Sequence, residues 1–195
     1  AQSDVEEFAQ YSGIPTINAL TDDEHPCQIL TDIFTFQERR GPIQGKVVTF
    51  VGDGACNVPV SWVHAAAALS FELRIAAPSE FQPSAETLAK AGGNVACTED
   101  IRAAVKGADM VYTDVWVSMG MEAKAEERLA KLAGYQINGE LMRLTKPNAL
   151  VMHCLPAYRG KEIDAETFEA HADTIFTQAE NRLHTQKAIL AWLTI

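Results

Sequence analysis

The chain has 195 residues, of which 47% are hydrophobic and 22% charged, a balance typical of a folded protein and not of a disordered or collagen-like one. The formal net charge of -10 repels nucleic-acid phosphates, so we expect no nucleic acid among its partners. No apolar run approaches the ~18 residues of a membrane-spanning helix, and the acidic N-terminus has no secretion-signal pattern. We therefore expect no membrane partner and a cytoplasmic location.

The first forty or so residues carry too few elements for a domain of their own. Residues 4–11 and 26–39 predict helices, and residues 13–17 predict one short strand. Pro26 favours the start of the second helix, because the first helical position needs no backbone N–H. Gly41 and Pro42 end it. One strand and two helices bury little core, so this segment is interpreted as the end of another domain.

From residue 47 onward, short apolar runs alternate with amphipathic ones. The predicted strands are residues 47–51, 73–77, 94–97, 110–113, 149–152 and 174–176. The predicted helices between and after them are residues 58–70, 84–91, 99–106, 121–133, 137–144, 164–171 and 180–195. This alternation is typical of an α/β fold with a doubly wound, Rossmann-like parallel sheet and helices on both faces.

Polar groups follow four of the predicted strands. In an open parallel sheet, ligands bind outside the carboxyl ends of the strands, so the segments that follow the strands are the candidate site. These segments are residues 52–57, 114–120, 153–156 and 178–182. We expect them to converge on one edge of the sheet.

The segment after the first strand does not predict a nucleotide cofactor. Gly52 and Gly54 make a tight turn, but Asn57 stands where the dinucleotide fingerprint G-x-G-x-x-G needs its third glycine. No His-x-x-x-His or Cys-x-x-Cys pair occurs, so no metal site is expected either. His64, His171 and His184 are interpreted as surface or packing residues. We expect no cofactor.

Three further segments carry chemistry, each with a structural alternative. Asp114 suits an ammonium group, while Ser118 offers a hydroxyl or else caps the following helix. Cys154 is either a small buried residue or a thiol beside a reacting centre. His25 and Gln28, at a helix start, either donate hydrogen bonds to a carbonyl or anion or belong to a helix cap.

Taken in order, these segments resemble the ornithine carbamoyltransferase family. The residues that carry the resemblance are His25-Pro26-Cys27-Gln28, residues 114–120, residues 134–138, His153-Cys154-Leu155-Pro156-Ala157 and Ala179-Glu180-Asn181-Arg182. The resemblance implies two α/β domains and carbamoyl transfer from carbamoyl phosphate to the side-chain amine of L-ornithine, giving citrulline and phosphate. It further implies a homotrimer and a place in arginine biosynthesis or the urea cycle.

The same resemblance divides the chain into three parts. Residues 1–44 correspond to the end of the carbamoyl-phosphate domain and a linking helix, and residues 45–178 to the ornithine-binding domain. Residues 179–195 correspond to a C-terminal helix that packs back toward the first domain. The family's Ser-Thr-Arg-Thr phosphate motif is not in this sequence, which predicts a chain without most of its carbamoyl-phosphate domain.

By resemblance, five residues hold the carbamoyl group. His25 and Gln28 contact it, the histidine at its carbonyl oxygen, and Arg182 reaches the same oxygen. Cys154 and Leu155 lie beside the carbamoyl group and the attacking amine. An oxyanion that develops in the reaction needs donors already aimed at it, which His25 and Arg182 supply.

By resemblance, four residues hold ornithine. Asn57 and the Met119 backbone bind its carboxylate, while Asp114 and Ser118 bind its α-amine. The side-chain amine, with a pKa near ~10, must lose a proton to attack, and Asp114 and Cys154 orient it. The catalytic residues expected are thus His25, Asp114, Cys154 and Arg182.

Besides the missing phosphate motif, a second departure and two alternatives accompany this interpretation. Cys56 stands where the family usually has a second asparagine, which removes part of the expected carboxylate contact. The first alternative is another amine acceptor, putrescine or a substituted ornithine, although putrescine has no carboxylate or α-amine for residues 114–120 to hold. The second is a non-catalytic, amino-acid-binding remnant.

Overall fold

The structure, a computed structural model, describes residues 1–118 and 120–194. Within them, five parallel strands form a sheet in the order β3-β2-β1-β4-β5. The strands are β1 (Val47–Val51), β2 (Glu72–Ala76), β3 (Val95–Thr98), β4 (Met110–Thr113) and β5 (Leu150–His153). The order runs outward from β1 in both directions, which is the doubly wound arrangement predicted from the sequence.

Alternate residues of the central strands point into two separate cores. Phe50 and Tyr112 stack at 6.0 Å between ring centroids on one face, where Trp62 packs edge-on against Tyr112. Val51 and Val111 belong to the core of the opposite face. Because side chains alternate along a strand, continuous apolar strands such as these need cover on both sides.

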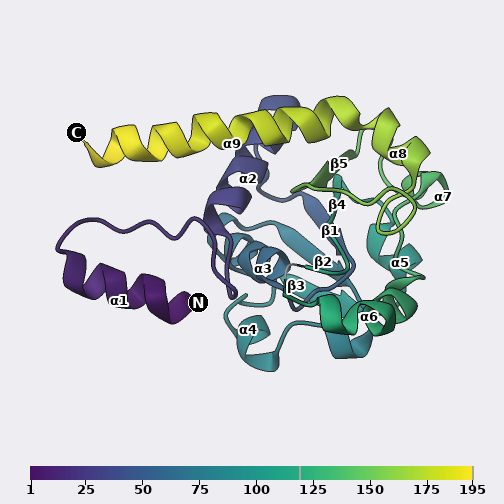
Figure 1. Ribbon diagram of the computed structural model, residues 1–195. Helices are drawn as coiled ribbons and strands as arrows, with labels where there is room; N and C mark the ends of the chain where they lie inside the picture. The colour runs from purple at the N-terminus through teal and green to yellow at the C-terminus, as the bar shows by residue number, and fades with distance from the viewer. Residues whose placement is uncertain (119, 195) are drawn as a thin grey trace.

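Helices provide that cover (Figure 1). Residues of α2 (Pro26–Arg40) and α3 (Asn57–Leu69) belong to the first core. Residues of α5 (Ile101–Val105), α7 (Gly139–Met142) and α8 (Ala165–Ala170) belong to the second. The remaining elements are α1 (Gln2–Ser12), η1 (Ser79–Phe81), α4 (Ala85–Ala89), η2 (Glu122–Lys124), α6 (Ala125–Leu132) and α9 (Ala172–Leu193).

Two predicted strands are wrong. Residues 13–17 are irregular, and Ile14 and Ile17 are exposed, because the described residues contain no strand for them to pair with. Residues 174–176 lie in the first turns of α9, where Ile175 is buried and Phe176 packs edge-on against Phe168 at 6.0 Å. This packing outweighs the weak strand preference of three residues. The other predicted strands and helices are present, two of the strands with the predicted ends (residues 47–51 and 110–113) and the rest with shifted ends.

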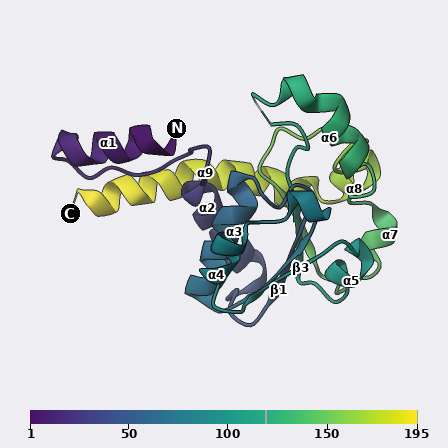
Figure 2. The same cartoon turned by 90° about the horizontal axis from the view of Figure 1, so that it is seen from below.

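A single helix therefore crosses the boundary expected between residues 178 and 179. Its first turns pack against α8, and its C-terminal half projects from the same side of the molecule as α1 (Figures 1 and 2). None of the residues of α1 is buried. Among the described residues, no helix combines the length and the apolar character that crossing a bilayer requires.

Polar contacts join α2 to α9. Arg39 Nη1 lies 2.7 Å from Asp173 Oδ2, and Asn181 Nδ2 donates to Thr35 Oγ1 at 2.9 Å. The second of these bonds is buried, so its loss would leave an unsatisfied polar group inside the protein. These contacts hold α2, which precedes the sheet in the chain, against α9, which follows it.

The turn after β1 leaves no room for a side chain at Gly54. An added Cβ would lie 2.5 Å from Ile75 Cγ2 and 3.0 Å from the Phe81 carbonyl oxygen. We expect Gly54→Ala to lower the free energy of unfolding by about 1–3 kcal/mol, measured by urea denaturation. Gly134→Ala is the control, because a Cβ there has no heavy atom within 4 Å. Equal losses in the two variants would contradict this account.

Candidate active site

The ends of β1, β4 and β5 lie side by side. Val51 pairs with Thr113, and Thr113 pairs with His153, so the segments that follow these three strands begin at one edge. The predicted convergence is confirmed for three segments. The fourth, residues 178–182, does not follow a strand, because it is part of α9.

Asp114 and Cys154 meet at this edge. Cys154 Sγ donates to Asp114 Oδ1 at 3.0 Å, and the same oxygen accepts the backbone N–H of Val115 at 2.7 Å. Burial, and then the negative charge of Asp114, raises the pKa of the Cys154 thiol well above its ordinary value. The thiol therefore keeps its proton and orients the carboxylate of Asp114 as a hydrogen-bond donor.

A buried pair supports the turn that carries Cys154. His153 Nε2 lies 3.1 Å from Glu162 Oε1, and His153 Nδ1 accepts the backbone N–H of Leu155 at 2.9 Å. Since Nδ1 is an acceptor, the ring proton is on Nε2 and points at Glu162. Leu155 has a φ of 57°, an uncommon conformation for a residue with a side chain, and the bond to His153 holds it there.

This arrangement bears on metal binding. Asp114, His153 and Cys154 each offer a donor atom, and these atoms lie within 4.8 Å of one another. Both nitrogens of His153 already have partners, Glu162 and Leu155. A metal at this cluster would have to break one of those bonds, so the residues present do not fit a metal centre.

His25, Gln28 and Arg182 form a second group. His25 and Gln28 lie at the start of α2, and Arg182 of α9 donates through Nη1 to Gln28 Oε1. Burial, and then the positive charge of Arg182, lowers the pKa of His25, which keeps the imidazole neutral near pH 7. His25 Nδ1 and Arg182 Nε are buried and have no partner among the described residues. Arg182 thus places a positive charge beside the neutral imidazole of His25.

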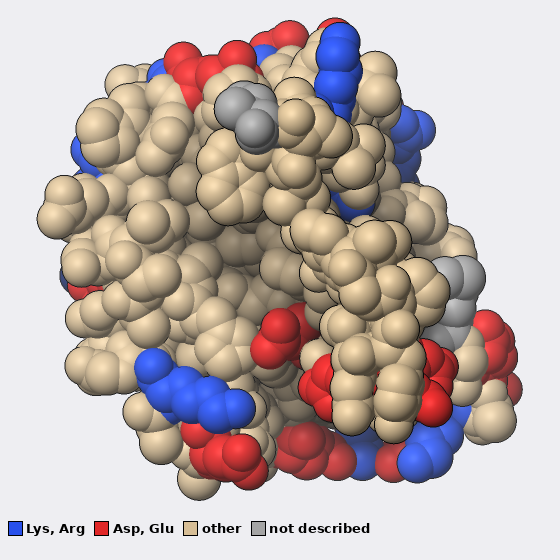
Figure 3. Space-filling model, turned by 90° about the vertical axis from the view of Figure 1, so that its left-hand side faces the viewer, with Lys and Arg blue, Asp and Glu red and all other residues tan. Residues whose placement is uncertain are grey.

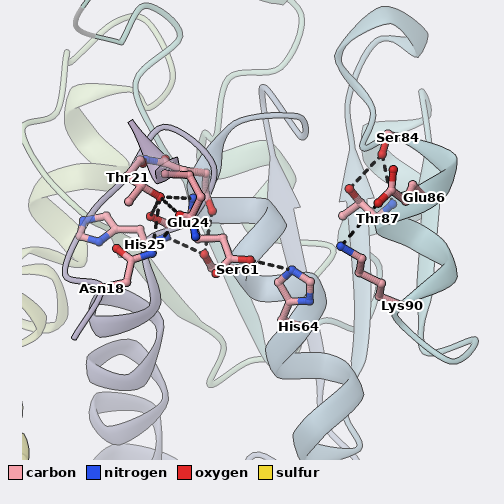
Figure 4. A network of polar contacts seen from close by, with 12 residues as sticks. Asn18, Thr21, Glu24, His25, Ser61, His64, Ser84, Glu86, Thr87 and Lys90 are labelled. Carbon is pink, nitrogen blue, oxygen red and sulfur yellow. Dashed lines mark hydrogen bonds and ion pairs between the residues drawn. The ribbon is translucent and has the colours of Figure 1, made fainter. Parts of the chain in front are cut away.

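The backbone around His25 is anchored by residues that the sequence did not single out (Figure 4). The His25 N–H donates to Ser61 Oγ at 2.7 Å, and the Glu24 N–H donates to Thr21 Oγ1 at 3.1 Å. His64, expected only to pack or face solvent, lies 3.2 Å from the Glu24 carboxylate. These contacts tie the turn before α2 to α3. The sequence carried no signal for the contacts of Ser61 and His64, because they join residues 36 or more positions apart.

The other residues predicted to bind ornithine lie in the segments that follow β1 and β4. Asn57 Nδ2 donates to the Thr21 carbonyl at 2.9 Å, so part of the predicted carboxylate ligand is occupied. Cys56 Sγ lies 3.2 Å from the Asp53 carbonyl oxygen. Ser118 is half-buried and does not cap a helix, since η2 begins at Glu122 with Met121 as its N-cap. Met119 lies outside the described residues.

Arg128 is a further residue that the sequence analysis missed. Its guanidinium pairs with Asp53 after β1 and donates through Nε to the Trp116 carbonyl at 2.8 Å. It also lies over the Phe81 ring at 4.9 Å from the centroid. Arg128 thus links α6 to the segments that follow β1 and β4 and holds these two segments together at the sheet edge.

Burial also controls the pKa of Asp32, which lies one turn after Gln28 on α2. Its side chain is 0% exposed, and burial raises its pKa from 3.8 to about 7, although hydrogen bonds from Gln28 and Gln178 and the charge of Arg182 oppose the shift. Between these two pH values the folded chain holds a proton on Asp32 that the unfolded chain has lost. The stabilisation from this group is therefore complete at low pH and falls as the pH rises toward 7.

We expect Asp32→Asn to remove this dependence. The difference in unfolding free energy, wild type minus variant, should fall by something on the order of 2–4 kcal/mol between about pH 4 and pH 7. Urea denaturation of both proteins at several pH values measures it. A constant difference across the range would show that Asp32 does not titrate there.

A second prediction concerns the Cys154 thiol. Asp114→Asn removes the negative charge beside it, which lowers its pKa and raises the thiolate fraction. Alkylation of Cys154 by iodoacetamide, followed by peptide mass spectrometry, should accelerate several-fold. Cys97 in the same protein is the control, since burial is what raises its pKa. Unchanged labelling of Cys154 would contradict the proposed contact with Asp114.

Two models of one protein family match the chain. Residues 44–193 match the family model "Aspartate/ornithine carbamoyltransferase, Asp/Orn binding domain", and residues 1–38 match the carbamoyl-P binding domain of the same family. The ornithine carbamoyltransferase of Methylococcus capsulatus is 50% identical over 193 residues, covering 99% of this chain and 64% of that protein. The Nitrosococcus oceani enzyme of the same name is 49% identical over 195 residues, covering 100% and 64%.

Solved structures give the same result. The anabolic ornithine carbamoyltransferase of Campylobacter jejuni superposes with a TM-score of 0.92 at 40% identity, covering 98% of this chain and 66% of that one. The Gloeobacter violaceus ornithine carbamoyltransferase superposes with a TM-score of 0.88 at 41% identity, covering 99% and 67%. This chain spans about 64% of the length of the curated relatives it matches.

Proposed function

Because the chain belongs to the aspartate/ornithine carbamoyltransferase family, we propose that the protein transfers the carbamoyl group of carbamoyl phosphate to the side-chain amine of L-ornithine. The products are citrulline and phosphate. The observation that carries the proposal is that two unlike groups lie close enough for the charge of Asp114 to act on the pKa of His25. Asp114 with Cys154 suits an amine, while His25, Gln28 and Arg182 suit a carbonyl.

The carbamoyl group would bind between α2 and α9. Arg182 Nε and His25 Nδ1 are among the buried atoms there that have no hydrogen-bond partner in the described residues, and Arg182 adds a positive charge. When the amine attacks, the carbonyl oxygen gains negative charge, and donors already held in place stabilise that charge without reorganising. A neutral His25 still donates through one ring nitrogen.

Ornithine would bind on the Asp114 side. The carboxylate of Asp114, with Ser118, receives an ammonium group, and Asn57 and the Met119 backbone receive the carboxylate. The neutral reacting amine forms the new N–C bond while the C–O bond to phosphate breaks, and the departing phosphate takes up the proton that the amine nitrogen loses. The protonated Cys154 thiol does not serve as the base, and its part is to orient Asp114.

We also propose that residues 1–44 are part of a carbamoyl-phosphate domain, as their family match supports. An apolar groove of about 760 Å³ lies between this segment and α9 (Figure 3). Its lining includes Ile17, Leu30, Phe34, Ile189 and Trp192. Residues from both ends of the chain build this groove, so we infer that more of the carbamoyl-phosphate domain packs into it, as the greater length of the relatives allows.

Three further proposals rest on the family alone. They are a homotrimer, a cytoplasmic location and a role in arginine biosynthesis or the urea cycle. The exposed apolar side chains of α9, Leu183, Leu190 and Trp192, are compatible with packing against another domain or subunit.

Calorimetry tests the acceptor. Ornithine should bind the chain at least ~10-fold more tightly than putrescine, which has no α-carboxylate, and Asp114→Asn should weaken ornithine binding by a similar factor. Glu166→Gln is the control, because Glu166 is an exposed carboxylate on α8 and takes no part in the candidate site. Equal affinity for the two amines, or an Asp114→Asn variant that binds ornithine as the wild type does, would contradict the proposal.

Citrulline formation from carbamoyl phosphate and ornithine tests the reaction itself. Cys154→Ala should lower the turnover that the protein supports, since Asp114 then loses its hydrogen-bond donor. An unchanged rate in both Asp114→Asn and Cys154→Ala would refute the assignment of the site.

A further inference from the structure

Two pairs of side chains, each spaced by four residues, face each other between α2 and α9. Gln28 and Asp32 share one face of α2, and Gln178 and Arg182 share one face of α9. Asp32 Oδ1 accepts from Gln28 Nε2 and from Gln178 Nε2, both at 2.7 Å. Arg182 donates to the other end of the Gln28 amide. These four side chains are called the interhelical network below.

The network permits one orientation of the Gln28 amide. Arg182 can only donate hydrogen bonds, and Asp32 accepts both bonds through one oxygen. A flipped amide would set the Gln28 NH2 group against the guanidinium and its carbonyl oxygen against the carboxylate. Asp32 therefore accepts a hydrogen bond from Gln28 Nε2, and the Gln28 carbonyl oxygen faces Arg182 and the candidate site.

Asp32 is itself held firmly. Gln178 Oε1 accepts the backbone N–H of His153 at 3.0 Å, so the NH2 group of Gln178 must point toward Asp32. The side chains of Asp32 and Gln178 are 0% exposed, and that of Gln28 is 2% exposed. Asp32 Oδ2 has no hydrogen-bond partner among the described residues. The Asp32 carboxyl group thus accepts from the two glutamines through Oδ1, and the Tyr112 hydroxyl is a further hydrogen-bond partner that lowers its pKa.

We propose that Asp32 is a positioning residue, which orients Gln28 and through it the Arg182 guanidinium toward the carbamoyl group. The identity of that ligand rests on the proposed function, whereas the orientation of Gln28 does not. The oriented pair is complementary to a carbamoyl group. The Gln28 carbonyl oxygen accepts from an NH2 group, and Arg182 donates to a carbonyl oxygen. An acetyl group, which has a methyl in place of the NH2, satisfies only Arg182.

Side-chain amide exchange in the 195-residue chain tests the orientation without any substrate. We expect Asp32→Leu to speed hydrogen exchange of the Gln28 NH2 group on the order of 10-fold, as seen by NMR, and to shift the Arg182 guanidinium signals. Asp32→Asn keeps an acceptor oxygen and should retain most of the protection. Thr35→Val is the matched control, because it removes another buried bond between α2 and α9, from Asn181, without touching Gln28.

Carbamoyl phosphate and acetyl phosphate then test the ligand. In the wild-type chain, carbamoyl phosphate should shift the Gln28 and Arg182 signals, and acetyl phosphate should shift those of Arg182 far more than those of Gln28. Asp32→Leu should lose this discrimination, and Asp32→Asn should restore it.

The outcomes separate the two proposals. The positioning role is overturned if the Gln28 NH2 group exchanges in Asp32→Leu at the wild-type rate. It is also overturned if Thr35→Val accelerates this exchange as much as Asp32→Leu does. Exchange that depends on Asp32, together with no response of Gln28 to carbamoyl phosphate, supports positioning and counts against the proposed function. If Asp32→Leu does not fold, Asp32→Ala carries the same prediction and is judged by the same signals.

Discussion

The packing of α2 against α9 is the constraint on which the candidate site depends. The buried carboxyl group of Asp32 joins the two helices through Gln28 and Gln178, and Gln178 joins both to the backbone at the end of β5. A polar group without partners in this position would cost free energy, so the interior favours the one arrangement that satisfies it. Gln28 and Arg182 come from opposite ends of the chain, and this arrangement is what makes them neighbours.

Burial determines the protonation of the site. It raises the pKa of the Cys154 thiol and lowers that of His25, so both groups are neutral near pH 7. Neutral groups serve here as hydrogen-bond donors, which suits a reaction in which charge develops on the substrate. The same effect acts on Asp32, whose raised pKa follows from its complete burial.

A layer of positioning residues surrounds those that we propose to face a ligand. His153 and Glu162 hold Leu155, Arg128 joins Asp53 to the Trp116 backbone, and Ser61 receives the His25 N–H. A site assembled from several turns and two helices needs a surrounding layer of hydrogen bonds to hold these separate parts in place. The motifs that carry the family resemblance contain few of these supporting residues.

The sequence by itself determined the parallel α/β sheet and the meeting of Asp114 with Cys154. Apolar runs such as residues 47–51 need cover on both faces, and parallel strands bring their carboxyl ends to one edge. Prediction from the sequence failed at residues 13–17 and 174–176, where a local strand preference competes with pairing and packing that the local sequence does not encode. Only the tertiary structure decided that α9 brings Arg182 to Gln28, that Asp32 accepts a hydrogen bond from Gln28, and that His64 contacts Glu24 in the turn before α2. These contacts join residues far apart in the chain, and their distances and burial, on which the hydrogen bonds and pKa shifts depend, exist only in the folded molecule.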